Sequence, residues 1–366
     1  MRPVEWRAIG QSVRGASHVR SGLPNQDAIR WLPASRVGPP LILTVSDGHG
    51  SPRNFRSDIG SRLAVEETAW LVQDLLDGQP DPGNLSAIKR TAEERLLEEV
   101  VRRWQKAVDE HLSKNPFTQE ELDTLEEKRG ARARRDVESA PRLAYGATIV
   151  TVLITSSFVL YLQLGDGDIL VISDKGEVKR PLPDDPRLIA NETTSLCMRK
   201  AWRDIRFHFQ ALFGEYPALI LLATDGYANS FVDEAGFFKV GTDILDMLQH
   251  EGPEMVEENL GTWLEDASTA GSGDDITLGI LYRTDIVGSA SKPQPKPKPK
   301  PKPEPEPEPE PAKAEELPPA QPETEAEATA APTEPQEEPP RPTGKGIERI
   351  KSEGPKEPTK KLPLDK

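Results

Sequence analysis

Cysteine is almost absent from this sequence, which has a single one, Cys197, among 366 residues. A disulfide within the chain needs two cysteines and a cysteine-rich zinc site needs more, so both are excluded. Basic charge is also in deficit, because 46 Lys and Arg stand against 61 Asp and Glu and give a net charge of −15. Nucleic-acid binding relies on a surplus of Lys and Arg, so we expect no nucleic-acid partner. An excess of carboxylates agrees better with the binding of cations.

Aromatic residues are missing from Lys292 to the end of the chain, and 21 of the 36 prolines lie in that part. Such a segment cannot bury enough apolar surface to offset the entropy of ordering it. We therefore expect a folded domain over 1–287 and a disordered tail over 288–366, rich in Pro, Glu and Lys. The alternating prolines favour a stiff polyproline II spacer, which is also able to dock a partner protein.

Long apolar runs are scarce, and only 143–165 invites comparison with a membrane helix, because it carries no charge. It is rich in Thr, Val and Ile and has a polar "TSS" at 155–157, which indicates two strands joined by a turn. We expect no membrane span. The first residues lack the apolar core of a signal peptide, so we expect a cytoplasmic protein.

The remaining patterns predict an α+β fold. Short apolar runs predict strands at 41–46, 143–155, 157–164, 168–173, 218–224 and 276–283. Apolar residues at helical spacing predict helices at 58–77, 85–112, 241–250 and 254–268. The charged segment 113–140 is expected to be a solvated insertion or helix end, and 181–217 to be irregular. Strands grouped apart from helices are typical of antiparallel sheets.

Aspartate recurs where these strands end. The strand "LILTVSDG" at 41–48 has a near copy, "LILLATDG", at 219–226, and "LYLQLGDG" at 160–167 ends in the same way. A fourth acidic pair, Asp274-Asp275, precedes the last predicted strand. A single Asp-Gly is usually a turn, but several carboxylates at strand ends would repel one another unless a cation lay between them. Ligands that are all oxygen favour Mg²⁺ or Mn²⁺ over zinc.

Six motifs, in this order, resemble those of the metal-dependent protein phosphatases of type 2C, and of their bacterial branch in particular. They are "NQDA" at 25–28, "SDGHGS" at 46–51, "YGATIV" at 145–150, "LGDGD" at 164–168, "ATDGYANS" at 223–230 and "GDDITL" at 273–278. The resemblance spans roughly residues 8–283. It implies a four-layer α-β-β-α sandwich of two antiparallel sheets, with two metal ions at one end.

The resemblance also implies roles for individual residues. Asp47 would bridge both metals, the Gly48 carbonyl would bind the second, and Asp225 and Asp274 would complete the first site. The other implied roles are a contact through water for Asp27, a third and weaker metal site for Asp166, and proton donation to the leaving oxygen for His49.

Two positions depart from the family pattern. Gln26 stands where the family has a Glu, and an amide oxygen is a weaker ligand for a hard cation. Gly22 stands where the family has an Arg that anchors the phosphate. The candidates to replace that Arg are Arg20, His18 and Arg53, and the nearest in sequence is Arg20.

The function expected from these residues is hydrolysis of phosphoserine and phosphothreonine in proteins by a water that two metals activate. Its partners would be phosphorylated proteins and a cognate Ser/Thr kinase. One alternative is a phosphoprotein-binding regulator on the same fold, impaired by Gln26 and the missing Arg. Another is a metal-dependent hydrolase of small phosphoesters.

Overall fold

Eleven strands form two antiparallel sheets in the computed structural model, which describes residues 4–79, 83–183 and 194–288. The five-stranded sheet has the order β2 (Ala28–Leu32), β4 (Leu41–Ser46), β5 (Ile149–Ile154), β6 (Phe158–Leu164) and β9 (Arg206–Ala211). The six-stranded sheet has the order β3 (Val37–Gly38), β1 (Trp6–Val13), β11 (Ile276–Arg283), β10 (Leu219–Ala223), β7 (Asp168–Ile172) and β8 (Val178–Lys179).

Both faces of the central strands are buried, which explains their nearly continuous apolar sequence. In β4, Leu41 and Leu43 pack between the sheets, whereas Ile42 belongs to the core under the helices. In β10, Ile220 packs between the sheets and Leu221 packs toward the helices on the other side. Alternate residues of one strand therefore serve two different cores.

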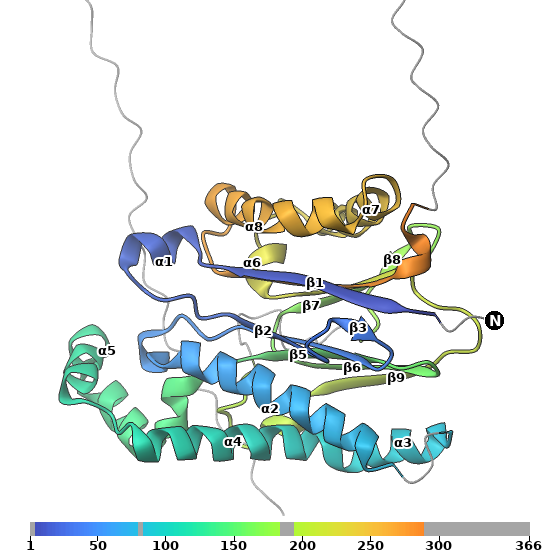
Figure 1. Ribbon diagram of the computed structural model, residues 1–366. Coiled ribbons are helices and arrows are strands. Elements are labelled where there is room, and N and C mark those ends of the chain that lie inside the picture. The colour runs from blue at the N-terminus through green and yellow to red at the C-terminus, as the bar shows by residue number, and fades with distance from the viewer. Residues whose placement is uncertain (1–3, 80–82, 184–193, 289–366) are drawn as a thin grey trace, which may run out of the picture. The chain divides into compact units, whose positions relative to one another are not determined.

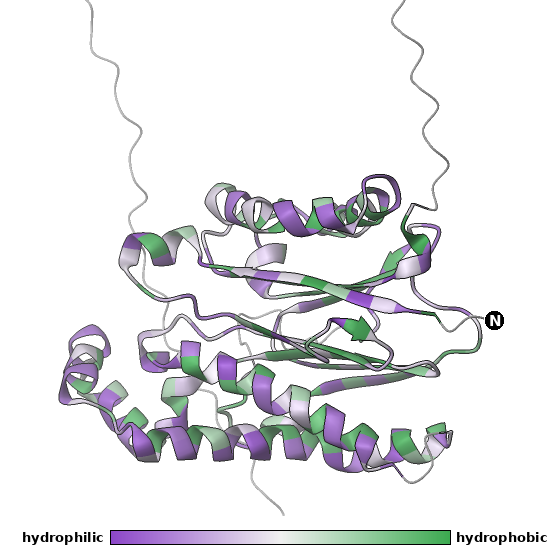
Figure 2. Ribbon diagram, in the orientation of Figure 1, coloured by the Kyte–Doolittle hydropathy of each residue, from purple (hydrophilic) through white to green (hydrophobic). Residues whose placement is uncertain are grey.

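Helices cover the outer face of each sheet (Figure 1). The helices α2 (Ser57–Asp77), α3 (Leu85–Thr91) and α4 (Leu97–Lys114) lie on the side of the five-stranded sheet. The helices α7 (Glu234–His250) and α8 (Pro253–Ala270) cover the six-stranded sheet. In Figure 2 the outer helices alternate between polar and apolar residues, as expected of helices with one face on a sheet and one face in solvent. The predicted α+β class and four-layer α-β-β-α sandwich are confirmed.

Two regions contain more regular structure than predicted: 113–140, predicted to be a solvated insertion or helix end, and 181–217, predicted to be irregular. The segment 113–140 includes a helix, α5 (Gln119–Ser139), interrupted at Gly130, which has a φ of 81°. Its buried residues, Leu125, Ala133 and Val137, are few and mostly small, so the apolar stripe is weak in the sequence. The strand β9 lies within the region predicted to be irregular. It was not predicted because it has only six residues and none of them is fully buried, so its apolar pattern is weak.

The stretch 143–165 contains β5 and β6, as predicted. The predicted start of the first strand is wrong, because residues 143–145 belong to a 3₁₀-helix (Pro141–Tyr145) and β5 begins at Ile149. None of the described helices is long and apolar enough to cross a membrane. The predicted tail lies outside the described residues, apart from Gly288. Two short helices, α1 (Ala16–Ser21) and α6 (Asp225–Ala228), lie near the ends of strands that carry the aspartates.

Candidate metal centre

Five aspartates meet at one end of the sandwich, where the starts and ends of strands from both sheets lie together. Asp47, Asp166 and Asp225 follow the last residues of β4, β6 and β10. Asp27 and Asp274 precede β2 and β11, whose first residues lie beside those ends. An antiparallel pair places the end of one strand beside the start of the next. Each sheet thus contributes carboxylates to one place.

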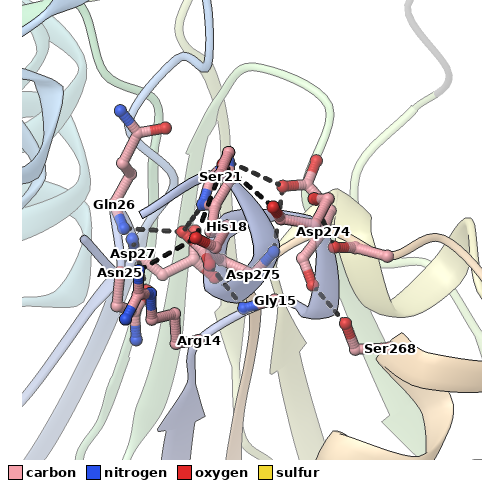
Figure 3. A network of polar contacts seen from close by, with 12 residues as sticks. Arg14, Gly15, His18, Ser21, Asn25, Gln26, Asp27, Ser268, Asp274 and Asp275 are labelled. Carbon is pink, nitrogen blue, oxygen red and sulfur yellow. Dashed lines mark hydrogen bonds and ion pairs between the residues drawn. The ribbon is translucent and has the colours of Figure 1, made fainter. Parts of the chain in front are cut away.

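Three of these carboxylates are close enough to share a cation. One oxygen from each of Asp47, Asp166 and Asp225 lies within 4.8 Å of the others. A second group, with the same spacing, consists of His18, Asp274 and Asp275 (Figure 3). The structure therefore gathers most of the aspartates that the sequence singled out into two groups. Asp274 lies in a different group from Asp47 and Asp225, and Asp27 lies in neither.

The loop after β4 is fixed by its backbone. The Asp47 N–H donates to Thr148 Oγ1 over 2.9 Å, and the Thr148 N–H donates to the Asp47 carbonyl over 2.8 Å. The His49 N–H donates to the Gly146 carbonyl over 3.1 Å. These bonds hold the Asp47 and His49 side chains on a rigid edge rather than on a free turn.

Glycine is required at position 48 for space. A Cβ atom there would lie 2.5 Å from the Ser57 carbonyl oxygen and 2.6 Å from the Gln26 carbonyl oxygen. The Gly48 N–H donates to that same Gln26 carbonyl over 3.1 Å. Gly48 is therefore needed because the backbone packs closely here. It is not needed for a left-handed turn, since its φ is not positive.

Asp27 is buried between two hydroxyl groups. Its Oδ2 accepts hydrogen bonds from Thr224 Oγ1 over 2.7 Å and from Thr277 Oγ1 over 2.8 Å. Burial, together with the charges of Asp275 and Asp225, nevertheless raises the pKa of Asp27 to about 8. The two threonines stand in the motifs "ATDG" and "DDITL", which gave the only sequence signal for them.

The same cause acts on the neighbouring carboxylates. Burial raises the pKa of Asp47 well above its usual range, and the charges of Asp27 and Asp225 add to the effect. Burial and the charge of Asp166 raise the pKa of Asp225 to about 6. Without a cation, these carboxyl groups thus keep their protons to higher pH than ordinary carboxyl groups do, whereas a cation would favour their charged forms.

The donor atoms present fit a hard divalent cation. Among the described residues, Gln26 Oε1 is a buried side-chain oxygen without a hydrogen-bond partner, beside the loop that holds Gly50. The group formed by Asp47, Asp166 and Asp225 offers only oxygen ligands. Carboxylate and carbonyl oxygens suit Mg²⁺ and Mn²⁺.

Asp275 has a structural position that the sequence analysis did not identify. Its Oδ1 accepts from the Gly15 N–H over 2.6 Å, and its Oδ2 accepts from the Gln26 N–H over 2.6 Å (Figure 3). His18 Nδ1 lies 2.8 Å from the same Oδ2. Both carboxylate oxygens are occupied, so Asp275 fixes the segment before β2 and orients the imidazole of His18.

The three candidates for the phosphate anchor lie in two places. His18 Nε2 is 3.9 Å from Asp274 Oδ1, and an Arg20 Nη atom is 3.9 Å from the place of a Cβ on Gly273. Both residues belong to α1, beside the loop of Asp274. Arg53 instead forms an ion pair of 3.5 Å with Asp136 on α5.

His49 lies next to Asp47 but is mostly buried. Burial lowers the pKa of His49 below its ordinary 6.5, and the charge of Asp166 acts in the opposite direction. A phosphate dianion bound nearby would also raise this pKa, since it favours the protonated imidazole.

The raised pKa values predict how stability changes with pH when no metal is bound. A folded carboxyl with a raised pKa stabilises the fold at low pH, and this contribution is lost as pH rises through the folded value. For Asp225 and Asp27 this loss of stability occurs between about pH 4 and about pH 8. We expect Mn²⁺ to raise the melting temperature of EDTA-treated protein more at pH 8 than at pH 5. Differential scanning fluorimetry measures this, and Asp225→Asn should reduce the difference. An equal shift at both pH values would contradict the assignment.

Comparisons with known proteins agree with this geometry. A family model described as "Protein phosphatase 2C" matches residues 14–265. The search of curated proteins found no match.

Solved structures were also matched. One of them is the catalytic domain of the serine/threonine phosphatase PstP, in complex with two manganese ions. It is 19% identical to this chain, the match covers 77% of this chain and 100% of the PstP chain, and the TM-score is 0.46. Stp1 from Staphylococcus aureus is 14% identical, with coverage of 75% and 94% and a TM-score of 0.46. PppA from Pseudomonas aeruginosa is 19% identical, with coverage of 76% and 97% and a TM-score of 0.43. The family assignment rests on the family model, since these scores lie below 0.5.

Proposed function

The chain belongs to the protein phosphatase 2C family, and from this premise we propose that it hydrolyses phosphoserine and phosphothreonine in proteins with Mg²⁺ or Mn²⁺. The observation that carries the proposal is the group formed by Asp47, Asp166 and Asp225, whose oxygens lie within 4.8 Å of one another. We extend the proposal to substrates that a Ser/Thr kinase phosphorylates in the cytoplasm.

The residues that would hold the metals are those at the strand ends. Asp47 would be the shared ligand of two cations, with Asp225 and Asp274 on one of them and the Gly48 carbonyl on the other. Asp27 would act through a water, and Asp166 would belong to a third, weaker site. When bound, the cations would activate a water for attack on phosphorus and neutralise charge on the phosphoryl oxygens.

His49 would supply the proton that the leaving serine or threonine oxygen needs. An alkoxide is a poor leaving group, so a positioned general acid lowers the barrier to its departure. The backbone bond from His49 to Gly146 and its neighbour Asp47 support this role, because they fix the imidazole beside the carboxylates.

Arg20 would bind the phosphoryl group in place of the missing family Arg. We expect Arg20→Ala to raise the KM for a phosphopeptide by about tenfold, as loss of one charged hydrogen bond of about 1–2 kcal/mol predicts. Steady-state kinetics measures this. Arg53→Ala is the matched control, since Arg53 pairs with Asp136, and a rise in KM confined to Arg53→Ala would contradict the choice of Arg20.

The experiment that tests the proposed function compares three substrates under one condition. With Mn²⁺, the full chain should release phosphate from a phosphothreonine peptide and less efficiently from a small phosphoester. A phosphotyrosine peptide serves as the third substrate, and faster turnover of it would contradict the proposed specificity. Binding of the phosphothreonine peptide with no phosphate release would favour the regulator, and a preference for the small ester would favour the third alternative.

A further inference from the structure

A cleft of about 330 Å³ opens beside the loop that carries Asp47. It is lined by three residues within the segment 23–26, by four residues within the segment 50–55 and by the first half of α5. The helix α5 belongs to the segment 113–140, to which the sequence assigned no function. The cleft therefore joins this segment to the edge of the candidate metal centre.

The cleft and the metal centre share a border. Gly50 and Ser51, which line the cleft, come directly after His49. Gln26 also lines the cleft. Its backbone N–H donates a hydrogen bond to the Asp275 carboxylate, whereas its side chain points away from Asp275 (Figure 3). A polypeptide with its phosphate at the carboxylates would thus pass the mouth of the cleft.

The chemistry of the lining indicates an apolar occupant. Leu23 is 37% exposed, Phe55 is half-buried and Leu125 is buried, and all three line the cleft. The carboxylate of Glu121 does not attract a cation, because both its oxygens accept from the Arg56 guanidinium, over 2.7 and 2.8 Å.

Charge at the rim does not favour an ionic occupant either. Glu120 and Lys128, both exposed on α5, carry opposite charges at the cleft. Neither a cationic nor an anionic side chain gains from such a rim, whereas a large apolar side chain gains by leaving water.

The wall formed by α5 is held rigidly. The buried Arg56 donates to Glu121 and to the Asn115 carbonyl, over 2.6 Å for the latter. The rings of Phe55 and Phe117 pack edge to face, with 5.2 Å between their centroids. A cleft with fixed walls binds its occupant without the further cost of ordering the walls, which suits a specificity pocket.

We propose that this cleft is a substrate subsite that takes one large apolar side chain, such as Leu, Met or Phe, close in sequence to the phosphorylated residue. An extended chain advances about 3.3 Å per residue, so a side chain within about three positions spans the border between site and cleft. The inference rests on the proposed function, because it assigns the occupant to the phosphoprotein substrate.

The test uses the full chain with Mn²⁺ and two readouts. Fluorescence anisotropy measures binding of peptides with a non-hydrolysable phosphonate analogue of phosphothreonine, and phosphate release measures turnover of the phosphothreonine forms. Each peptide carries Leu or Phe at one flanking position in an alanine background. At one position, we expect binding about tenfold tighter than for the all-alanine peptide, as a hydrophobic pocket provides.

Two pairs of variants separate the cleft from the rest of the surface. Leu23→Ser removes apolar lining and Thr124→Trp fills the cleft, so each should reduce the tenfold preference to about twofold or less. Val19→Ser, at a residue 59% exposed on α1, and Glu127→Trp, on the exposed side of α5, should keep the preference.

The outcomes distinguish this inference from the proposed function. Turnover without any positional preference in the wild type, or a preference that survives Leu23→Ser and Thr124→Trp, overturns the subsite alone. A cleft-dependent preference in binding without turnover supports the subsite and overturns hydrolysis. A last outcome concerns a synthetic peptide of residues 292–311. If it displaces the apolar peptide from the wild type but not from Leu23→Ser, the cleft belongs to the chain's own Pro-rich segment and the inference is overturned.

Discussion

Asp47→Asn and Asp225→Asn should each lower phosphatase turnover on the order of 10³-fold while the fold is kept. The two carboxylates come from different sheets, and their oxygens lie within 4.8 Å of each other and of Asp166. An amide in place of either would weaken the hold on a cation that stabilises the transition state by several kcal/mol. Phosphate release from a phosphothreonine peptide measures the loss, and calorimetric titration should show weaker Mn²⁺ binding.

The melting temperature distinguishes a loss of metal binding from a loss of folding. Because burial and neighbouring charge raise the pKa of Asp47, its charged form destabilises the metal-free fold, so Asp47→Asn should melt at the same or a higher temperature at pH 8. Asp266→Asn, at an exposed residue of α8, is the control and should change neither property. Wild-type turnover in Asp47→Asn would remove the basis for a metal centre here.

His49→Ala should lower kcat for a phosphothreonine peptide by about 10²–10³-fold, because a positioned general acid contributes an effect of this size. The loss should be much smaller for p-nitrophenyl phosphate, whose leaving group departs without a proton. KM should change little, since His49 is proposed to act on the leaving oxygen and not on the phosphoryl group.

The control for this variant is His250→Ala, because His250 ends α7 and bonds to the Asp246 carbonyl of its own helix. Comparing the two esters is the decisive part of the experiment. Equal losses for the peptide and for p-nitrophenyl phosphate would assign His49 to structure or to metal positioning and would refute proton donation.

The four-layer sandwich was implied by the resemblance of the six motifs to those of type 2C phosphatases. The strands themselves could be predicted because the central ones are buried on both faces. Strands such as β4 and β10 therefore appear as short apolar runs, and each ends in an Asp-Gly pair at the same edge. Antiparallel pairing places each Asp beside a neighbouring strand of its own sheet, and the packing of the two sheets brings Asp47 and Asp225 together. The matching ends of these two strands thus predict that Asp47 and Asp225 lie near each other.

Other parts depended on contacts that leave little trace in the sequence. The helix α5 buries few residues and is anchored by Arg56, which is 65 positions from its partner Glu121. Asp275 looked like a duplicate of Asp274, yet its oxygens bind backbone N–H groups about 250 positions away. Long-range polar contacts of this kind follow from the packed fold and not from local periodicity.

The central claim is that the clustered carboxylates make phosphate release depend on a divalent cation. The most direct measurement follows inorganic phosphate from a phosphothreonine peptide while Mn²⁺ is added to EDTA-treated full chain. We predict no release without metal, a saturable rise as Mn²⁺ is added, and hardly any rise in Asp47→Asn. Release that is independent of Mn²⁺, or that rises equally in Asp47→Asn, would contradict the account.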